Sequence, residues 1–127
     1  GALSLEPSST NFSVNELRCK CQHCQSMKPN KVDPATLVFL QAIRDDLDEP
    51  MSLSSAYRCE LHDSEASKVR PGTHNRGLAF DIRVPWGEKR MKIIKLAIKH
   101  GFKGFGYANS FIHIDMGSDQ FRSWGYN

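Results

Sequence analysis

Residues 77–84 have the sequence Gly-Leu-Ala-Phe-Asp-Ile-Arg-Val, in which apolar and polar side chains alternate. Alternation with a period of two predicts a strand with one buried face, because successive side chains of a strand point to opposite sides. Phe80, Ile82 and Val84 then share the buried face, and Asp81 lies on the other face. A carboxylate in such an apolar strand is costly to bury unless it is paired or binds a metal. The stretch therefore predicts a core strand that carries a functional group.

Residues 111–116 repeat this pattern near the end of the chain. The two isoleucines of this stretch share one face, and His113 and Asp115 share the other. If the two strands are neighbours in a sheet, Asp81 joins His113 and Asp115 on one side of it. Polar groups on matching faces of two apolar strands predict a single site.

Two helices and one further strand are predicted in the rest of the chain. Asp33-Pro34 is typical of a helix start, and Pro50 ends the helix. The buried face of this helix is predicted at Leu37, Leu40, Ile43 and Leu47. Residues 51–56 predict a short strand, and residues 104–107 a glycine-rich turn. Residues 88–100 predict a second helix, whose buried side is expected at Met91, Ile94, Ala97 and Ile98.

Length and composition fit an ordinary globular protein. The chain has 127 residues, of which 39% are hydrophobic and 24% charged. These values predict a single domain over residues 1–127, with residues 1–17 as an N-terminal segment wrapping the surface. Apolar runs no longer than Leu37–Leu40 exclude a membrane span, and no signal peptide is visible. The net charge of +3 comes from scattered basic residues, so we expect no nucleic-acid partner.

The four cysteines are unevenly placed. Cys19, Cys21 and Cys24 lie within six residues, and Cys59 follows much later in the chain. Four thiolates, or three with His23, could form a structural zinc site. One or two disulfides, or reduced thiols, fit the same spacing. The sequence leaves these three alternatives open.

His74 precedes Asp81 by seven residues, and Gly77 between them permits a turn from loop into strand. His74 could therefore reach over the end of the strand that carries Asp81. Two imidazoles and one carboxylate, with an open fourth position, are typical of a catalytic zinc site. Alternatively, His74 is a surface residue and Asp81 pairs with Arg58 or Arg83. The polar loop of residues 60–76 is long enough to indicate a functional role.

These motifs together resemble a known family. Ser54-Ser55-Ala56-Tyr57-Arg58, then Thr73-His74-(six residues)-Asp81, then Phe111-Ile112-His113-Ile114-Asp115 are similar to the D-alanyl-D-alanine carboxypeptidase type of zinc peptidase. The superfamily also holds vancomycin-resistance dipeptidases, phage endolysins and the hedgehog signalling domain. The resemblance covers residues 12–124. It implies an α+β fold, with a small antiparallel sheet, helices packed on one face and a zinc site on the other.

The resemblance also implies roles for individual residues. His74, Asp81 and His113 match the three zinc ligands, and Arg58 matches an arginine that stabilises negative charge on substrate or intermediate. Many relatives carry Glu or Asp three residues before the last histidine, where this chain has Ser110. Asp115 is then the candidate general base, or alternatively a hydrogen-bonded partner that fixes the ring of His113. A less favoured assignment makes Asp115 the ligand and His113 the base.

Tyr107 is a further candidate for the site, as a hydrogen-bond donor to the intermediate. The implied function is a monomeric zinc metallopeptidase that hydrolyses peptidoglycan stem peptides or cross-links, as a carboxypeptidase or endopeptidase. Such a hydrolase acts in the periplasm or cell wall, or as a phage endolysin or virion protein. The alternative is a zinc-stabilised binding module of the same fold that has lost catalysis. The second ion, if the cysteines bind one, would be structural.

Overall fold

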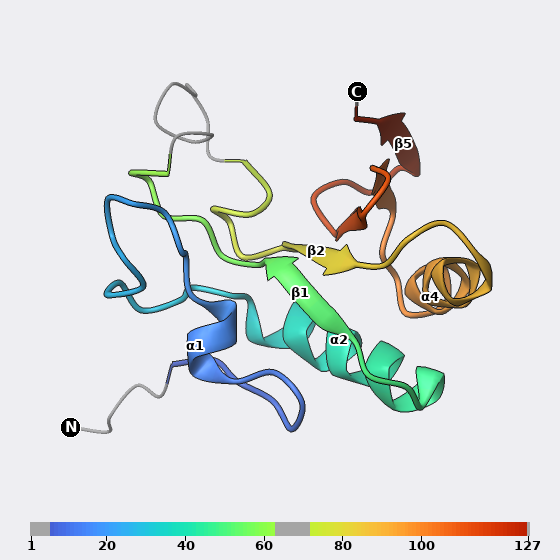
Figure 1. Ribbon diagram of the computed structural model, residues 1–127, viewed down its shortest axis with the longest axis horizontal. Coiled ribbons are helices and arrows are strands. Elements are labelled where there is room, and N and C mark those ends of the chain that lie inside the picture. The colour runs from blue at the N-terminus through green and yellow to red at the C-terminus, as the bar shows by residue number, and fades with distance from the viewer. Residues whose placement is uncertain (1–5, 63–71, 127) are drawn as a thin grey trace.

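The computed structural model describes residues 6–62 and 72–126. Within these residues, five strands form one sheet in the order β1-β2-β4-β3-β5. The strands are β1 (Ser52–Ser55), β2 (Ala79–Arg83), β3 (Gly104–Tyr107), β4 (Phe111–Asp115) and β5 (Arg122–Gly125). The helices are α1 (Val14–Leu17), α2 (Pro34–Leu47) and α4 (Glu88–Lys99), as Figure 1 shows. The α+β class is confirmed.

The sheet is mixed, whereas the sequence predicted an antiparallel one. β1, β2, β4 and β3 pair antiparallel, but β5 pairs parallel to β3. The chain reverses direction after β4, yet the returning strand cannot pair with β4, because β2 and β3 already occupy both of its edges. β5 therefore joins the open edge of β3, where its direction is parallel.

The prediction of a turn at residues 104–107 was wrong, because these residues form the strand β3. Its glycines are required by packing. A Cβ on Gly106 would lie 2.6 Å from Nε1 of Trp124, and one on Gly104 would lie 2.5 Å from Oδ2 of Asp115 and 2.6 Å from Nη2 of Arg122. The bare backbone of β3 thus makes room for side chains of β5.

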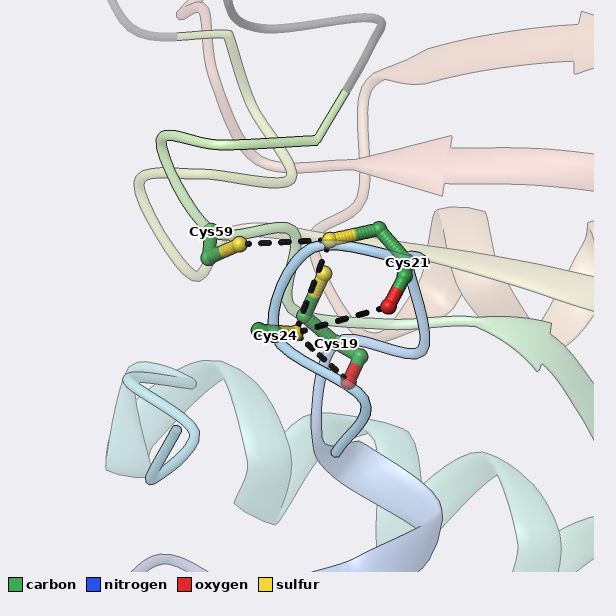
Figure 2. Close-up of side chains that lie close together, drawn as sticks. All are labelled: Cys19, Cys21, Cys24 and Cys59. Carbon is green, nitrogen blue, oxygen red and sulfur yellow. Dashed lines mark hydrogen bonds between the residues drawn. The ribbon is translucent and has the colours of Figure 1, made fainter. Parts of the chain in front are cut away.

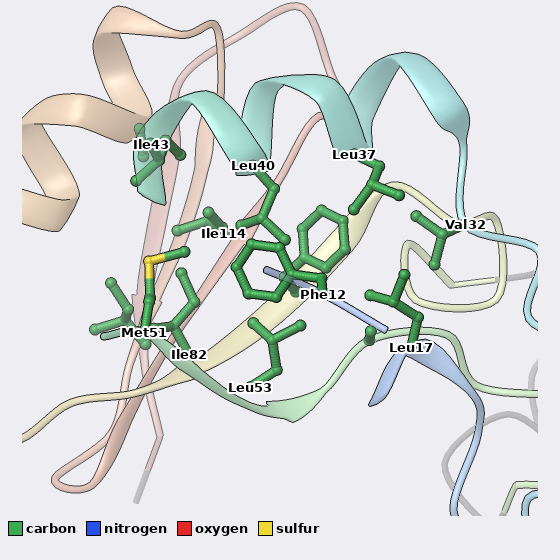
Figure 3. Close-up of a cluster of buried hydrophobic side chains, with 14 of the residues drawn as sticks. Phe12, Leu17, Val32, Leu37, Leu40, Ile43, Met51, Leu53, Ile82 and Ile114 are labelled. Carbon is green, nitrogen blue, oxygen red and sulfur yellow. The ribbon is translucent and has the colours of Figure 1, made fainter. Parts of the chain in front are cut away.

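α2 follows the prediction closely. Oδ2 of Asp33 accepts a hydrogen bond from the backbone N of Thr36 (3.0 Å), and Pro34 is the first helical residue. The helix ends at Asp48 in the left-handed conformation, two residues before Pro50. The four apolar residues predicted for its inner face are buried, and Figure 3 shows Leu37, Leu40 and Ile43 over the core side of the sheet.

The buried side of α4 matches the prediction only in part, since Ala97 is buried and Ile94 packs against the core as expected. Met91 and Ile98 are about half exposed, while Arg90, Ile93 and Ala97 are buried. Nη2 of Arg90 donates to the backbone oxygens of Val84 (2.5 Å) and Ala108 (2.7 Å), and its guanidinium lies 4.0 Å from the centre of the Trp86 ring. These contacts fix the rotation of α4, which apolar periodicity alone does not reveal.

The N-terminal segment enters the core. Phe12 and Leu17 are completely buried, and Ser13 caps α1 by accepting from the backbone N of Glu16. Residues 6–17 thus supply core side chains in addition to covering the surface.

The two faces of the sheet differ in chemistry. Phe80, Ile82, Ile112 and Ile114 belong to the hydrophobic core with α2 and α4. Asp81 pairs across the sheet with His113, so the polar side chains of β2 and β4 project together from the opposite face. No helix within the described residues is long and apolar enough to cross a membrane.

Candidate metal centre

Three ligand atoms converge on the polar face of the sheet. Oδ1 of Asp81 lies 3.0 Å from Nδ1 of His113 and 3.2 Å from Nε2 of His74. The two nitrogens are 3.1 Å apart. All three residues are buried. We call these residues the His–Asp–His group.

A tight turn before β2 brings His74 to this group. The backbone N of Leu78 donates to the carbonyl of Thr73 (3.0 Å), and Gly77 adopts a positive φ of 76° that glycine tolerates without strain. A Cβ at Gly77 would lie 2.8 Å from the backbone N of Asp33, which also favours glycine here. The turn carries His74 back over the start of β2.

Hydrogen bonds on the outer side of each imidazole fix which nitrogen faces the centre. Nδ1 of His74 lies 2.7 Å from the carbonyl of Ala56, so it must carry the proton, and Nε2 is left unprotonated toward the group. Nε2 of His113 donates to Oδ2 of Asp115 (2.7 Å), which leaves Nδ1 for the centre. Both rings therefore present a lone pair to the same point.

The geometry fits a zinc ion. Zinc–ligand bonds of about 2.0–2.1 Å in a tetrahedron place neighbouring ligand atoms roughly 3.3 Å apart. The three separations observed here, 3.0, 3.1 and 3.2 Å, are close to that value. Two neutral imidazoles and one carboxylate are also the donor set of catalytic zinc sites, which keep a fourth position open.

The charges around the group keep Asp81 ionised. Burial raises the pKa of Asp81, but its interactions with the rings of His113 and His74 outweigh this effect and hold the pKa well below its usual value. Burial lowers the pKa of His113, but hydrogen bonds to Asp115 and Asp81 outweigh it and raise the pKa, so zinc binding would displace a proton from this ring. Asp81 is therefore an ionised carboxylate, as a metal ligand must be.

Arg58 lies beside the group, three residues after the end of β1. Its Nη2 donates to the second oxygen of Asp81 (2.9 Å), and its Nε donates to Oγ of Ser55 (3.0 Å). Tyr57, the preceding residue, is buried in the hydrophobic core. The guanidinium thus orients Asp81 and borders the pocket described below.

A family model for peptidase M15 matches residues 10–115. The chain belongs to the peptidase M15 family. This is the family of D-Ala-D-Ala carboxypeptidase-type zinc peptidases, so the resemblance based on the three motifs is confirmed. No curated protein matches the chain at a significant level.

In this M15 chain, Asp115 sits behind His113 and not among the three converging atoms. Its Oδ2 accepts from Nε2 of His113, and its Oδ1 accepts from the backbone N of Gly117 (3.0 Å) and from Nη2 of Arg122 (2.5 Å). Both oxygens are engaged and the side chain is buried. These contacts favour the second role that the sequence left open for Asp115, that of fixing the His113 ring.

A pocket of about 310 Å³ opens over the His–Asp–His group. Its lining consists of Arg58, Thr73, His74, His113, Asp115, Arg122, Trp124 and Tyr126. The last three come from β5 and the residue after it, beyond the stretch that the family model matches. Sequence reasoning missed them, although the alternation in Arg122-Ser123-Trp124-Gly125-Tyr126 is a strand signal.

The structure does not bring Tyr107 to this pocket. Tyr107 pairs with Ile112, whose side chain belongs to the core face of β4, and its ring lies 6.4 Å from that of Trp86. Trp124 instead lies next to the group, with its ring 5.2 Å from that of His113. Ser110 carries no carboxylate, and its carbonyl accepts from the backbone N of Val84.

The four cysteines form a second group that could hold a metal, with all four sulfur atoms within 4.8 Å of one another. His23 is exposed and lies outside this group. In the 60–76 loop, residues 63–71 lie outside the described part of the chain, so the function predicted for that loop stays a prediction.

Proposed function

We propose that this chain is a zinc-dependent peptidase that hydrolyses peptide bonds in the stem peptides or cross-links of bacterial peptidoglycan. The proposal rests on one observation above all, the convergence of His74, Asp81 and His113 at the base of a pocket in an M15 chain. The family consists of zinc metallopeptidases, which supports peptide hydrolysis.

The His–Asp–His group would hold the zinc ion through Nε2 of His74, Oδ1 of Asp81 and Nδ1 of His113. When bound, zinc supplies Lewis acidity and lowers the pKa of a coordinated water to near neutrality. The protein holds the proton of each imidazole on its outer nitrogen, at Ala56 and at Asp115, so both ligands stay oriented. This preorganisation is the contribution of the polypeptide.

Arg58 is proposed to stabilise negative charge on the substrate or intermediate. Its guanidinium is fixed by Asp81 and Ser55, and its side chain is about one-quarter exposed toward solvent. A planar, permanently charged donor suits a carboxylate or an oxyanion better than a flexible ammonium does. Replacing Arg58 by Lys should therefore lower turnover while zinc stays bound.

The pocket chemistry supports a peptide that carries free carboxylates. Two guanidiniums, Arg58 and Arg122, flank it, and Trp124 and Tyr126 add aromatic surface. Stem peptides of peptidoglycan are rich in carboxylates, so they match this charge. The products released will identify the bond that is cut, and therefore whether the protein acts as a carboxypeptidase or an endopeptidase.

The test is digestion of purified sacculi by the zinc-loaded protein, with released muropeptides identified by mass. We expect release by the wild type and none by His113→Ala. His100→Ala is the matched control, because His100 pairs with Asp46 at the end of α4 and does not line the pocket. Activity that survives in His113→Ala would contradict the proposal.

A second candidate function is a zinc-stabilised binding module without catalysis. The observation that favours it is Ser110, which stands where many relatives carry the catalytic carboxylate. In that case the wild type sediments with sacculi but releases no muropeptides. The same experiment therefore separates the two functions.

A further inference from the structure

Figure 2 shows four cysteine sulfurs that meet from two distant parts of the chain. Cys19, Cys21 and Cys24 lie in the loop after α1, and Cys59 lies just beyond β1. Sγ of Cys21 is 3.5 Å from Sγ of Cys24 and 3.6 Å from Sγ of Cys59. We call these residues the four-cysteine group.

These distances exclude disulfides in this arrangement. A disulfide requires its sulfur atoms to be about 2.05 Å apart, and all four thiols here are free. Zinc–sulfur bonds of about 2.3 Å in a tetrahedron place the sulfurs roughly 3.8 Å apart. The separations around Cys21 lie close to this second value.

The surroundings match a closed metal site. Cys19, Cys24 and Cys59 are buried, and Cys21 is partly buried. Four protein ligands leave no open position for a substrate, which is typical of structural zinc. All four sulfur atoms lie within 4.8 Å of one another, as four ligands of one ion require.

The backbone of the loop supports the same interpretation. After Cys24 the chain turns through two residues with positive φ, Gln25 (49°) and Ser26 (62°). The backbone N of Gln25 donates to the carbonyl of Cys21 (2.9 Å), and that of Met27 donates to the carbonyl of Cys24 (2.8 Å). Left-handed conformations are costly for non-glycine residues, so another interaction must hold this turn in place.

We propose that the four-cysteine group binds a structural zinc ion through four thiolates. The ion would join the N-terminal loop to residue 59, in addition to the hydrogen bond from the backbone N of Tyr57 to the carbonyl of Leu17 (3.2 Å). Cys59 directly follows Arg58, whose side chain contacts Asp81. The ion would therefore anchor the segment that positions Arg58 at the pocket.

The decisive measurement is metal content and ligand type in the full chain, prepared under reducing conditions. We expect two zinc ions per chain in the wild type and one in the His74→Ala/His113→Ala double variant. Cobalt substitution of this double variant should give the near-ultraviolet charge-transfer bands of thiolate ligands. Because this variant lacks the His–Asp–His group, the result does not depend on the proposed peptidase function.

Two further changes, each made in the double variant, complete the test. Cys59→Ser should weaken the thiolate bands, because three thiolates remain, whereas His23→Ala should leave them unchanged, because His23 lies in the same loop but outside the group. If Cys59→Ser does not fold, the wild type still decides. Its four thiols should resist alkylation until a chelator has removed both zinc ions.

The proposal would be overturned by a cobalt-substituted double variant without thiolate bands, by rapid alkylation of the thiols in the zinc-loaded wild type, or by iron at this group in place of zinc. A disulfide found by intact mass in protein that still contains two zinc ions would overturn it as well.

Discussion

Removing the carboxylate of Asp115 should weaken zinc binding without removing any ligand. Asp115 touches the His–Asp–His group only through Nε2 of His113, at 2.7 Å. Loss of such an outer partner typically costs 10–100-fold in metal affinity, or about 1.4–2.7 kcal/mol. We expect Asp115→Ala to fall in this range.

Asp115→Asn should lie between Asp115→Ala and the wild type. Asparagine keeps one oxygen that can accept from His113, but its amide nitrogen then faces Arg122 and Gly117, which both donate to Asp115. Arg122 is more than one-third exposed and can turn toward water, so this conflict is partly relieved. We expect a loss of zinc affinity of less than about tenfold.

The assay is competition for zinc with a chelator of known affinity at fixed pH. All variants keep the four cysteines, so differences between them report on the His–Asp–His group. Asp119→Ala is the control, since Asp119 is exposed and four residues away in sequence. The positioning role of Asp115 would be refuted if Asp115→Ala kept the zinc affinity of the wild type, or if Asp115→Ala and Asp115→Asn lost the same amount of affinity. A large loss of turnover in zinc-saturated Asp115→Asn would instead support Asp115 as the base.

Three further predictions test the ligand set, the core and the N-terminal segment. Asp81→Ala should lose the zinc of the His–Asp–His group, because two imidazoles alone hold it weakly; metal analysis showing full occupancy there contradicts the assignment. Leu40→Ala should lower the free energy of unfolding by about 2–5 kcal/mol in urea, whereas Val38→Ala, exposed on the same helix, should change it little. The hydrogen bond from Arg18 lowers the pKa of Glu6 to about 2 from 4.5, so its stabilisation is present above pH 4.5 and lost as the pH falls toward 2. Glu6→Gln should flatten the pH dependence of stability in that interval, and an unchanged acid limb would contradict this.

The elements that the sequence predicted best are those whose signal is local. α2 combines a capping Asp33, Pro34 and a regular apolar face, so its start and its buried side were both right. The expected strands 77–84 and 111–116 contain β2 and β4, because alternation records which side of a strand is buried. The same alternation placed Asp81 and His113 on the face away from the core.

Predictions failed where a distant partner decides the structure. β3 is a strand in which Gly104 and Gly106 leave space for side chains of β5. The sequence does not show this pairing, and glycines without a known partner favour the prediction of a turn. α4 is rotated by Arg90, whose buried guanidinium contacts carbonyls outside the helix. Helical periodicity assigns arginine to solvent, so this error was built into the signal.

The sequence by itself determined the family, the α+β class and the side chains that compose the metal group, since motif spacing and strand period are properties of the chain. Only the tertiary structure showed that Asp81 pairs with His113 across the sheet and that His74 lies next to both. It also showed that Arg122, Trp124 and Tyr126 line the pocket. The tertiary structure also brings Cys59 next to the loop that contains Cys24, which lies 35 positions earlier in the sequence. Local backbone geometry fixes which way a side chain points, whereas the meeting of remote segments depends on packing of the whole chain.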